Sequence, residues 1–125
     1  SKLRRTIAER MTQSWREIPH VTTFDQVDAG RLLAARRALS ERHQRVLPIE
    51  ALVAKAVIPG LASFPEFNAT LEGDELILHR RFDLGFAVDT PDGLVVARCQ
   101  DADKLGLMDL AGEVSRLAEG AKAIG

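Results

Sequence analysis

The apolar positions at the start of the chain recur at a helical interval, with charged or amide side chains at most positions between them. The residues of this stripe are Leu3, Ile7, Met11 and Trp15. Their spacing predicts a helix over residues 3–16. Pro19 ends it, because the residue before a proline is disfavoured in the helical conformation.

The next segment, HVTTFDQVD (residues 20–28), has the β-branched content that is typical of a strand. One face carries His20, Thr22, Phe24 and Gln26, and the other carries Val21, Thr23, Asp25 and Val27. Since neither face is cleanly apolar, we expect the strand to lie at an edge, or on a surface that another chain covers.

Two helices should follow this strand. Asp28 is suited to cap the first, over residues 29–43. The second begins after Leu47 and spans residues 49–64, and its nearly continuous apolar content predicts burial on every side. Pro59 inside this helix is expected to kink or shorten it.

The pattern of apolar and turn-forming residues in the rest of the chain predicts strands and one more helix. The strands fall at residues 68–72, 75–81, 83–90 and 94–100, with turns at 73–74 and 91–93, and the helix falls at residues 107–122. A helix, a strand, two helices, a run of strands and a helix indicate an α+β layered sandwich. Its strands have apolar residues on both faces, which implies a partner or a missing half.

Composition excludes several classes of protein. Lys and Arg total 17 against 18 Asp and Glu, which argues against a nucleic-acid binder with a broad cationic surface. The single cysteine excludes an internal disulfide framework, and no apolar run reaches the length of a membrane span. The N-terminus has no signal-peptide core. These features predict a soluble, intracellular chain.

Arg36 interrupts an apolar stripe, since it lies at helical spacing between Leu33 and Leu39. One interpretation is that its stem covers apolar surface while its charged head reaches water. The other is an anion contact, because a planar guanidinium fits a phosphate group.

Asp89 shares a strand face with Gly85 and Ala87, while larger residues occupy the other face. Asp is common where a strand meets a turn, so the position alone does not require a function. The small residues also favour a narrow slot for an extended ligand, in which the carboxylate accepts hydrogen bonds from a hydroxyl or an amide.

No complete catalytic apparatus is visible in the sequence. His20 opens the exposed strand without a defined acidic partner, and His43 and His79 lie in charged, solvated stretches. Cys99 should pack with its strand neighbours, and no His or Cys pair has metal-ligand spacing. We therefore predict no catalytic residue and no metal site in this chain.

An ordered set of motifs nevertheless resembles one family. The motifs are RRTIAERMTQS (residues 4–14), IPHVTTFDQVD (18–28), LLAARRAL (32–39), FPEFNAT (64–70), GFAVDTPDGLVV (85–96) and LAGEVSRLAE (110–119). In this order they resemble the N-terminal half of the catalytic core of dihydrolipoamide acyltransferases, components of 2-oxo-acid dehydrogenase complexes. FDQVD is closer to branched-chain members.

The resemblance implies transfer of an acyl group between a dihydrolipoyl arm, carried on a separate domain, and coenzyme A. Arg36 matches the family's cofactor-contacting arginine, and Asp89 its aspartate at the cofactor channel. Pro48 stands where branched-chain members have serine, and Ala118 where they have glutamine. The family's general-base histidine lies in a His-x-x-x-Asp-Gly motif that this chain lacks. The chain alone is therefore expected to be inactive.

The implied fold is a two-layer α/β sandwich resembling chloramphenicol acetyltransferase, of which residues 1–125 form the N-terminal half. The implied partners are further copies, as a trimer or a larger core, together with the lipoyl domain and dehydrogenase components. Neither nucleic acid nor membrane is an expected partner. The compartment would be the cytoplasm, or the mitochondrial matrix in a eukaryote. The alternative hypothesis is a non-catalytic assembly module of the same fold.

Overall fold

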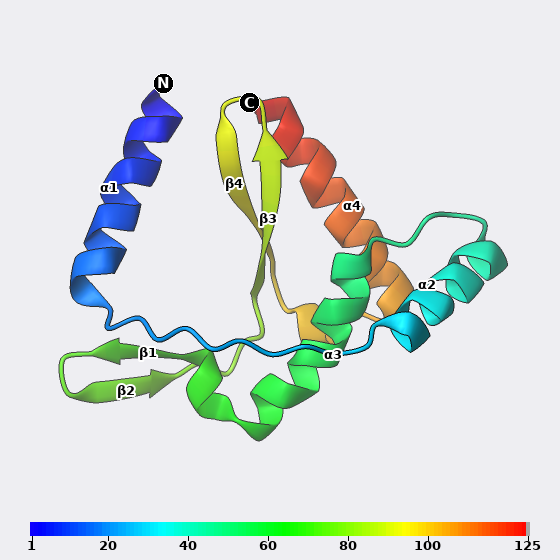
Figure 1. The fold of residues 1–125 in the computed structure, drawn as a ribbon, viewed down its shortest axis with the longest axis horizontal. Coiled ribbons are helices and arrows are strands. Elements are labelled where there is room, and N and C mark those ends of the chain that lie inside the picture. Colours follow the sequence, from blue (N-terminus) through cyan, green and yellow to red (C-terminus); the bar gives the residue numbers. More distant parts are fainter. Residues whose placement is uncertain (125) are drawn as a thin grey trace.

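The structure, a computed structural model, describes residues 1–124 and combines helices with antiparallel strands (Figure 1). The elements are α1 (Lys2–Glu17), α2 (Gly30–His43), α3 (Ile49–Ser63), β1 (Ala69–Glu72), β2 (Glu75–Leu78), β3 (Leu84–Thr90), β4 (Gly93–Cys99) and α4 (Leu107–Ile124). Short 3-10 helices occupy Pro65–Asn68 and Ala102–Lys104. The predicted mixed helix-and-sheet class is confirmed.

The core lies where α4 packs against the β3–β4 hairpin and α3 packs against α4 (Figure 1). Leu47, Cys99 and Leu110 are its largest fully buried side chains. Leu84 and Phe86 of β3 pack against this cluster. One face of the hairpin is therefore covered by a helical layer, as the alternation of large and small residues along β3 predicts.

The other face of the hairpin is open. Gly85, Ala87 and Asp89 are exposed on it, and they pair with Arg98, Val96 and Leu94 of β4. A Cβ atom at Gly85 would lie 2.9 Å from Cγ1 of Val96. The space beside this glycine is therefore already filled by the cross-strand valine.

The β1–β2 hairpin forms a separate two-stranded sheet. The Asn68 amide closes its base by donating to the carbonyl oxygen of Arg81 at 2.9 Å. Gly73, at φ +60°, provides the left-handed conformation that its turn needs. The strand predicted over residues 75–81 is shorter, because the chain turns after Leu78 to meet Asn68.

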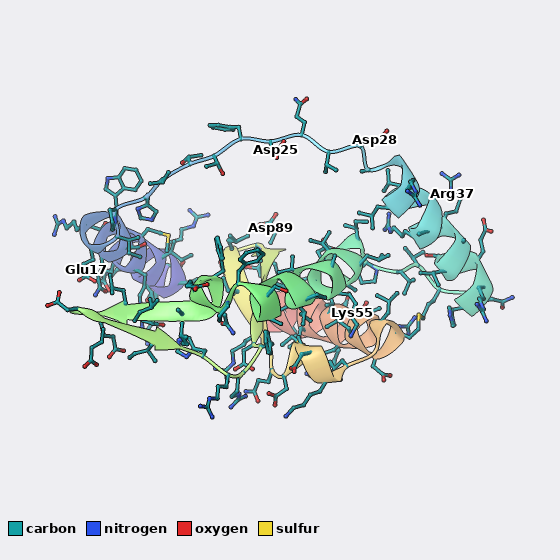
Figure 2. The ribbon with its side chains drawn as sticks, turned by 90° about the horizontal axis from the view of Figure 1, so that it is seen from below. Glu17, Asp25, Asp28, Arg37, Lys55 and Asp89 are labelled. Carbon is teal, nitrogen blue, oxygen red and sulfur yellow. The ribbon has the colours of Figure 1, made fainter. Side chains whose placement is uncertain are left out.

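The strand predicted over residues 20–28 is wrong for this chain. The segment between α1 and α2 is extended and exposed throughout, and it arches away from both hairpins, so that no strand lies beside it to complete a hydrogen-bonded ladder (Figure 2). Val21, Phe24 and Val27 are 87%, 92% and 90% exposed. The segment is therefore drawn out without the pairing that would define a strand within residues 1–124.

Two expectations about the helices also need correction. Helix α3 buries Ala51, Leu52, Ala54 and Ile58, yet Val53 and Val57 on its other side are exposed, because no described element covers them. Pro59 does not shorten the helix, which continues to Ser63.

The other helix boundaries agree with the sequence to within two residues, although Ala29 rather than Asp28 is the residue that precedes α2. The Asp28 carboxylate still accepts from the amide of Gly30 at 2.8 Å. Within residues 1–124, no helix is long and apolar enough to cross a membrane.

Candidate functional site

A hollow of about 320 Å³ runs along β3 on the side away from β4, between the start of α3 and the end of α4. Its wall is formed by Pro48, Glu50, Phe86, Ala87, Val88, Asp89, Val114, Ser115, Leu117, Ala118, Glu119 and Lys122. We call it the Asp89 hollow. It differs from the slot expected beside Gly85, since the helices rather than the open hairpin face form its far wall.

The charges around the Asp89 hollow are mostly negative. Glu50, Asp89 and Glu119 contribute carboxylates, and Lys122 contributes one ammonium group. Within the described chain, none of the ion pairs involves these four residues. The carboxylates are therefore free to accept hydrogen bonds from hydroxyl or amide groups of a ligand.

Pro48 and Ala118 lie in the wall of the Asp89 hollow. Neither side chain can form a hydrogen bond, so polar recognition in the hollow depends on the charged residues and Ser115. Sequence reasoning did not identify Glu50, Glu119 or Lys122, because periodicity along α3 and α4 does not show which turns of these helices lie beside β3.

Arg36 lies outside the Asp89 hollow. Its side chain is half-buried, and its Nε donates to the carbonyl oxygen of Leu47 at 2.7 Å. The amide of Leu47 donates to the hydroxyl of Ser40 at 3.1 Å. Side chains of α2 thus satisfy both backbone groups of Leu47, which directly precedes Pro48 of the Asp89 hollow.

A second hollow, of about 280 Å³, lies beside α2, and we call it the Arg36 hollow. It is lined by Leu33, Arg36, Arg37, Ser40 and Val46. Figure 2 shows Arg37 on α2 at one end of the molecule and Asp89 near its middle. The structure therefore places the two predicted site residues in separate hollows, connected through Leu47 and Pro48.

No described histidine or cysteine lines either hollow. His20 stacks on Trp15 with ring centroids 5.2 Å apart, and Nε2 of His79 lies 2.7 Å from the Thr70 hydroxyl. Burial raises the pKa of the Cys99 thiol, which keeps it protonated and unreactive at neutral pH. Within residues 1–124, no cluster of His, Cys, Asp and Glu could hold a metal ion.

The shortest ion pair of the described residues, and a backbone hydrogen bond to an aspartate, also lie away from the two hollows. Arg116 contacts both carboxylate oxygens of Glu113, at 2.6 and 3.0 Å, and this pairing lowers the pKa of Glu113. The backbone amide of Asp101 donates to Asp83 and lowers the pKa of that carboxyl group. None of these four residues lines either hollow.

Comparison with known proteins gives consistent matches. The family model described as 2-oxoacid dehydrogenases acyltransferase (catalytic domain) matches residues 1–124. The acetyltransferase component of the Cupriavidus necator pyruvate dehydrogenase complex is 38% identical over 122 residues, which are 95% of this chain and 22% of that protein. The succinyltransferase component of the Escherichia coli 2-oxoglutarate dehydrogenase complex is 34% identical over 94% of this chain and 30% of its own length.

Solved structures agree with these matches. A structure of Azotobacter vinelandii dihydrolipoamide acetyltransferase, determined to study a serine, a histidine and an asparagine in its catalytic mechanism, has a TM-score of 0.91 and 37% identity. The match covers 98% of this chain and 53% of that one. The cubic core of a pyruvate dehydrogenase complex matches with a TM-score of 0.90 and 36% identity. This chain therefore spans about half of the solved chains, and less of the curated relatives.

Proposed function

Because the chain belongs to the 2-oxoacid dehydrogenase acyltransferase family (catalytic domain), we propose that it forms part of an enzyme that moves an acyl group between a dihydrolipoyl group and coenzyme A. The observation that carries this proposal is the family match over residues 1–124. The relatives are named as acetyl- and succinyltransferases acting on a dihydrolipoyllysine residue. We propose a lipoyl group on a separate domain as the acyl donor or acceptor.

In this proposal the chain supplies the N-terminal half of the domain and one side of the coenzyme A site. Asp89 would accept a hydrogen bond from a hydroxyl or amide group of the cofactor in the Asp89 hollow. Arg36 would contact an anionic or polar part of it. The general base and the oxyanion-stabilising hydroxyl would come from residues outside this chain.

Solved relatives include the cores of multienzyme complexes, which supports oligomeric assembly. We propose a trimer or a larger core that works with lipoyl domains and dehydrogenase components, in the cytoplasm or in the matrix of a mitochondrion. The second candidate function is a non-catalytic assembly module of the same fold, which would share this oligomeric assembly.

Replacing Asp89 tests the proposed cofactor site. Asp89→Asn keeps the shape of the side chain but removes the charge, so hydrogen bonds that it accepts become weaker. We expect coenzyme A to bind about fivefold more weakly, since hydrogen bonds to charged groups are worth about 1 kcal/mol more than neutral ones. The measurement is calorimetric titration of coenzyme A into the protein.

Asp92→Asn is the matched control, because Asp92 lies in the adjacent turn and does not line the Asp89 hollow. It removes the same charge a short distance away and should leave affinity unchanged. Equal losses in both variants would indicate a general effect of negative charge. Unchanged affinity in Asp89→Asn would remove Asp89 from the site.

The exposed apolar side chains between α1 and α2 predict self-association, because a monomer rarely leaves such a surface uncovered. In light scattering at micromolar concentration, the protein should have a mass well above the 13.7 kDa of one chain. Phe24→Asp should reduce this mass without unfolding the chain, since Phe24 is 92% exposed. Gln26→Asp adds the same charge nearby and should change the mass less. A stable monomer without dye-binding apolar surface would contradict the prediction.

A further inference from the structure

Thr90, the last residue of β3, is a buried polar residue directly after Asp89. Among the described residues it is the only polar or charged one that is buried, with 7% of its surface exposed. Its hydroxyl donates to the carbonyl oxygen of Gly93 at 2.5 Å. We infer that Thr90 is a positioning residue, which holds Asp89 at the Asp89 hollow by closing the β3–β4 turn. The inference deepens the proposed function and rests on it for the ligand, coenzyme A.

The β3–β4 turn needs such a restraint because of its sequence. Pro91 and Asp92 form it, between the paired residues Thr90 and Gly93. Two-residue hairpin turns favour types I′ and II′, which match the twist of the strands and require a positive φ at the first turn residue. The proline ring fixes φ at about −65°, and neither Pro91 nor Asp92 has a positive φ. A turn of the remaining types tends to splay its two strands.

The Thr90 hydroxyl counteracts this splaying. Thr90 and Gly93 are the last pair of the ladder, so the bond from hydroxyl to carbonyl ties the two strands together at the turn itself. Because Thr90 is buried, water has little access to its hydroxyl, and breaking the bond would leave a buried donor without an acceptor. The closed turn is therefore favoured over an open one.

Gly93 is also fixed by a contact from α1. Its φ of +134° is a conformation that residues with a side chain rarely adopt. A Cβ atom at this position would lie 3.4 Å from Cδ1 of Ile7, which is half-buried on the apolar stripe of α1. Figure 1 shows the N-terminal end of α1 and the β3–β4 turn at the same end of the molecule. Both Thr90 and α1 therefore hold this turn.

Asp89 depends on the turn because it lies one pair from the end of the ladder, opposite Leu94. The ends of such elements open most readily unless they are held. Asp89 is exposed, and none of the ion pairs within residues 1–124 involves it. Its carboxylate is therefore placed mainly by the backbone of the strand. A binding group must be held within about 0.5 Å of its productive position, so a loosened turn would weaken its contact with a ligand.

The test is calorimetric titration of coenzyme A into Thr90 variants of the protein, with thermal unfolding of each variant. Thr90→Val keeps the shape of the side chain but removes the donor. It should weaken binding about tenfold, the loss of one hydrogen bond to a charged group. Thr90→Ser keeps the hydroxyl and should restore most of the affinity. Thr70→Val is the matched control, because Thr70 is a hydrogen-bonded threonine of the other hairpin and does not line the Asp89 hollow.

A double variant separates positioning from a general loss of stability. In an Asp89→Ala background no carboxylate remains to be positioned, so Thr90→Val should have no further effect on affinity. A purely structural defect would weaken binding by the same factor in both backgrounds. That result would overturn the inference and leave the proposed function standing, as would unchanged affinity in Thr90→Val alone.

Hydrogen exchange without ligand tests the turn independently of the proposed function. Thr90→Val should speed the exchange of backbone amides between residues 89 and 94 and leave the β1–β2 hairpin unchanged. If coenzyme A does not bind to the unaltered protein, the proposed ligand is wrong, and the exchange rates alone decide whether Thr90 holds Asp89 in place. Rates that are unchanged, or faster throughout the chain, would then overturn the inference.

Discussion

Supplied with dihydrolipoamide and an acyl-coenzyme A, the 125-residue chain by itself is expected to transfer acyl groups about 10²–10⁴-fold more slowly than a complete acyltransferase core. The reason is the lack of a general base beside the hollows. His20 stacks on Trp15 and His79 contacts Thr70, while neither hollow contains a histidine. The measurement is the rate of free coenzyme A release at saturating dihydrolipoamide.

A complete homologous acyltransferase core, assayed in parallel, provides the reference rate. His20→Ala, His43→Ala and His79→Ala should leave any residual rate unchanged, because none of these side chains lies at a hollow. Turnover comparable to that of the complete core would show that the active site has been misplaced. A residual rate that disappears in one histidine variant would identify the base directly.

Arg36→Ala is expected to weaken coenzyme A binding by about 1.5–3 kcal/mol, the range for hydrogen bonds to charged groups. The sequence alone suggested little effect on stability, because a side chain that only covers surface contributes through its stem. The structure changes that expectation. Loss of the Nε donor leaves the partly buried Leu47 carbonyl unpaired, so the free energy of unfolding should also fall by about 1–3 kcal/mol.

Calorimetric titration and thermal unfolding of the same variants separate the two effects. Arg36→Lys should recover only part of the binding, since a single ammonium group cannot donate to Leu47 and hold a planar contact with an anion at once. Arg31→Ala, on an exposed position of the same helix, is the control for loss of charge. Unchanged affinity in Arg36→Ala with a clear drop in melting temperature would make Arg36 a purely structural residue.

Local periodicity predicted the helices and the β3–β4 hairpin because these elements are defined by contacts between residues near one another in sequence. The four-residue stripe of α1 and the alternation along β3 required no knowledge of distant segments. The segment over residues 20–28 was different, since its residues have strand propensity but a strand also needs a neighbour. Within residues 1–124, that neighbour is missing.

The candidate site was predictable in its residue types more than in its geometry. Asp89 was correctly assigned to the face of small residues, yet the adjacent hollow lies along the strand edge and involves α4. Lys122 could not be found from sequence, because its position beside β3 depends on how α4 crosses the hairpin. Arg36 and Asp89 were expected to act together, and the structure places them in different hollows.

The two bonds to Leu47 affect how a single long ligand would bind. They hold the carbonyl and the amide of Leu47, which lies in the link between α2 and α3. The Arg36 and Asp89 hollows on either side of this link therefore keep a set separation. Once one end of a spanning ligand is bound, the other end meets its hollow as an intramolecular event at a high effective concentration. Two weak and chemically different contacts then give the ligand a higher affinity than either contact alone would. A ligand whose length does not match that separation would bind through one end only and lose this gain in affinity, even when each of its ends would fit.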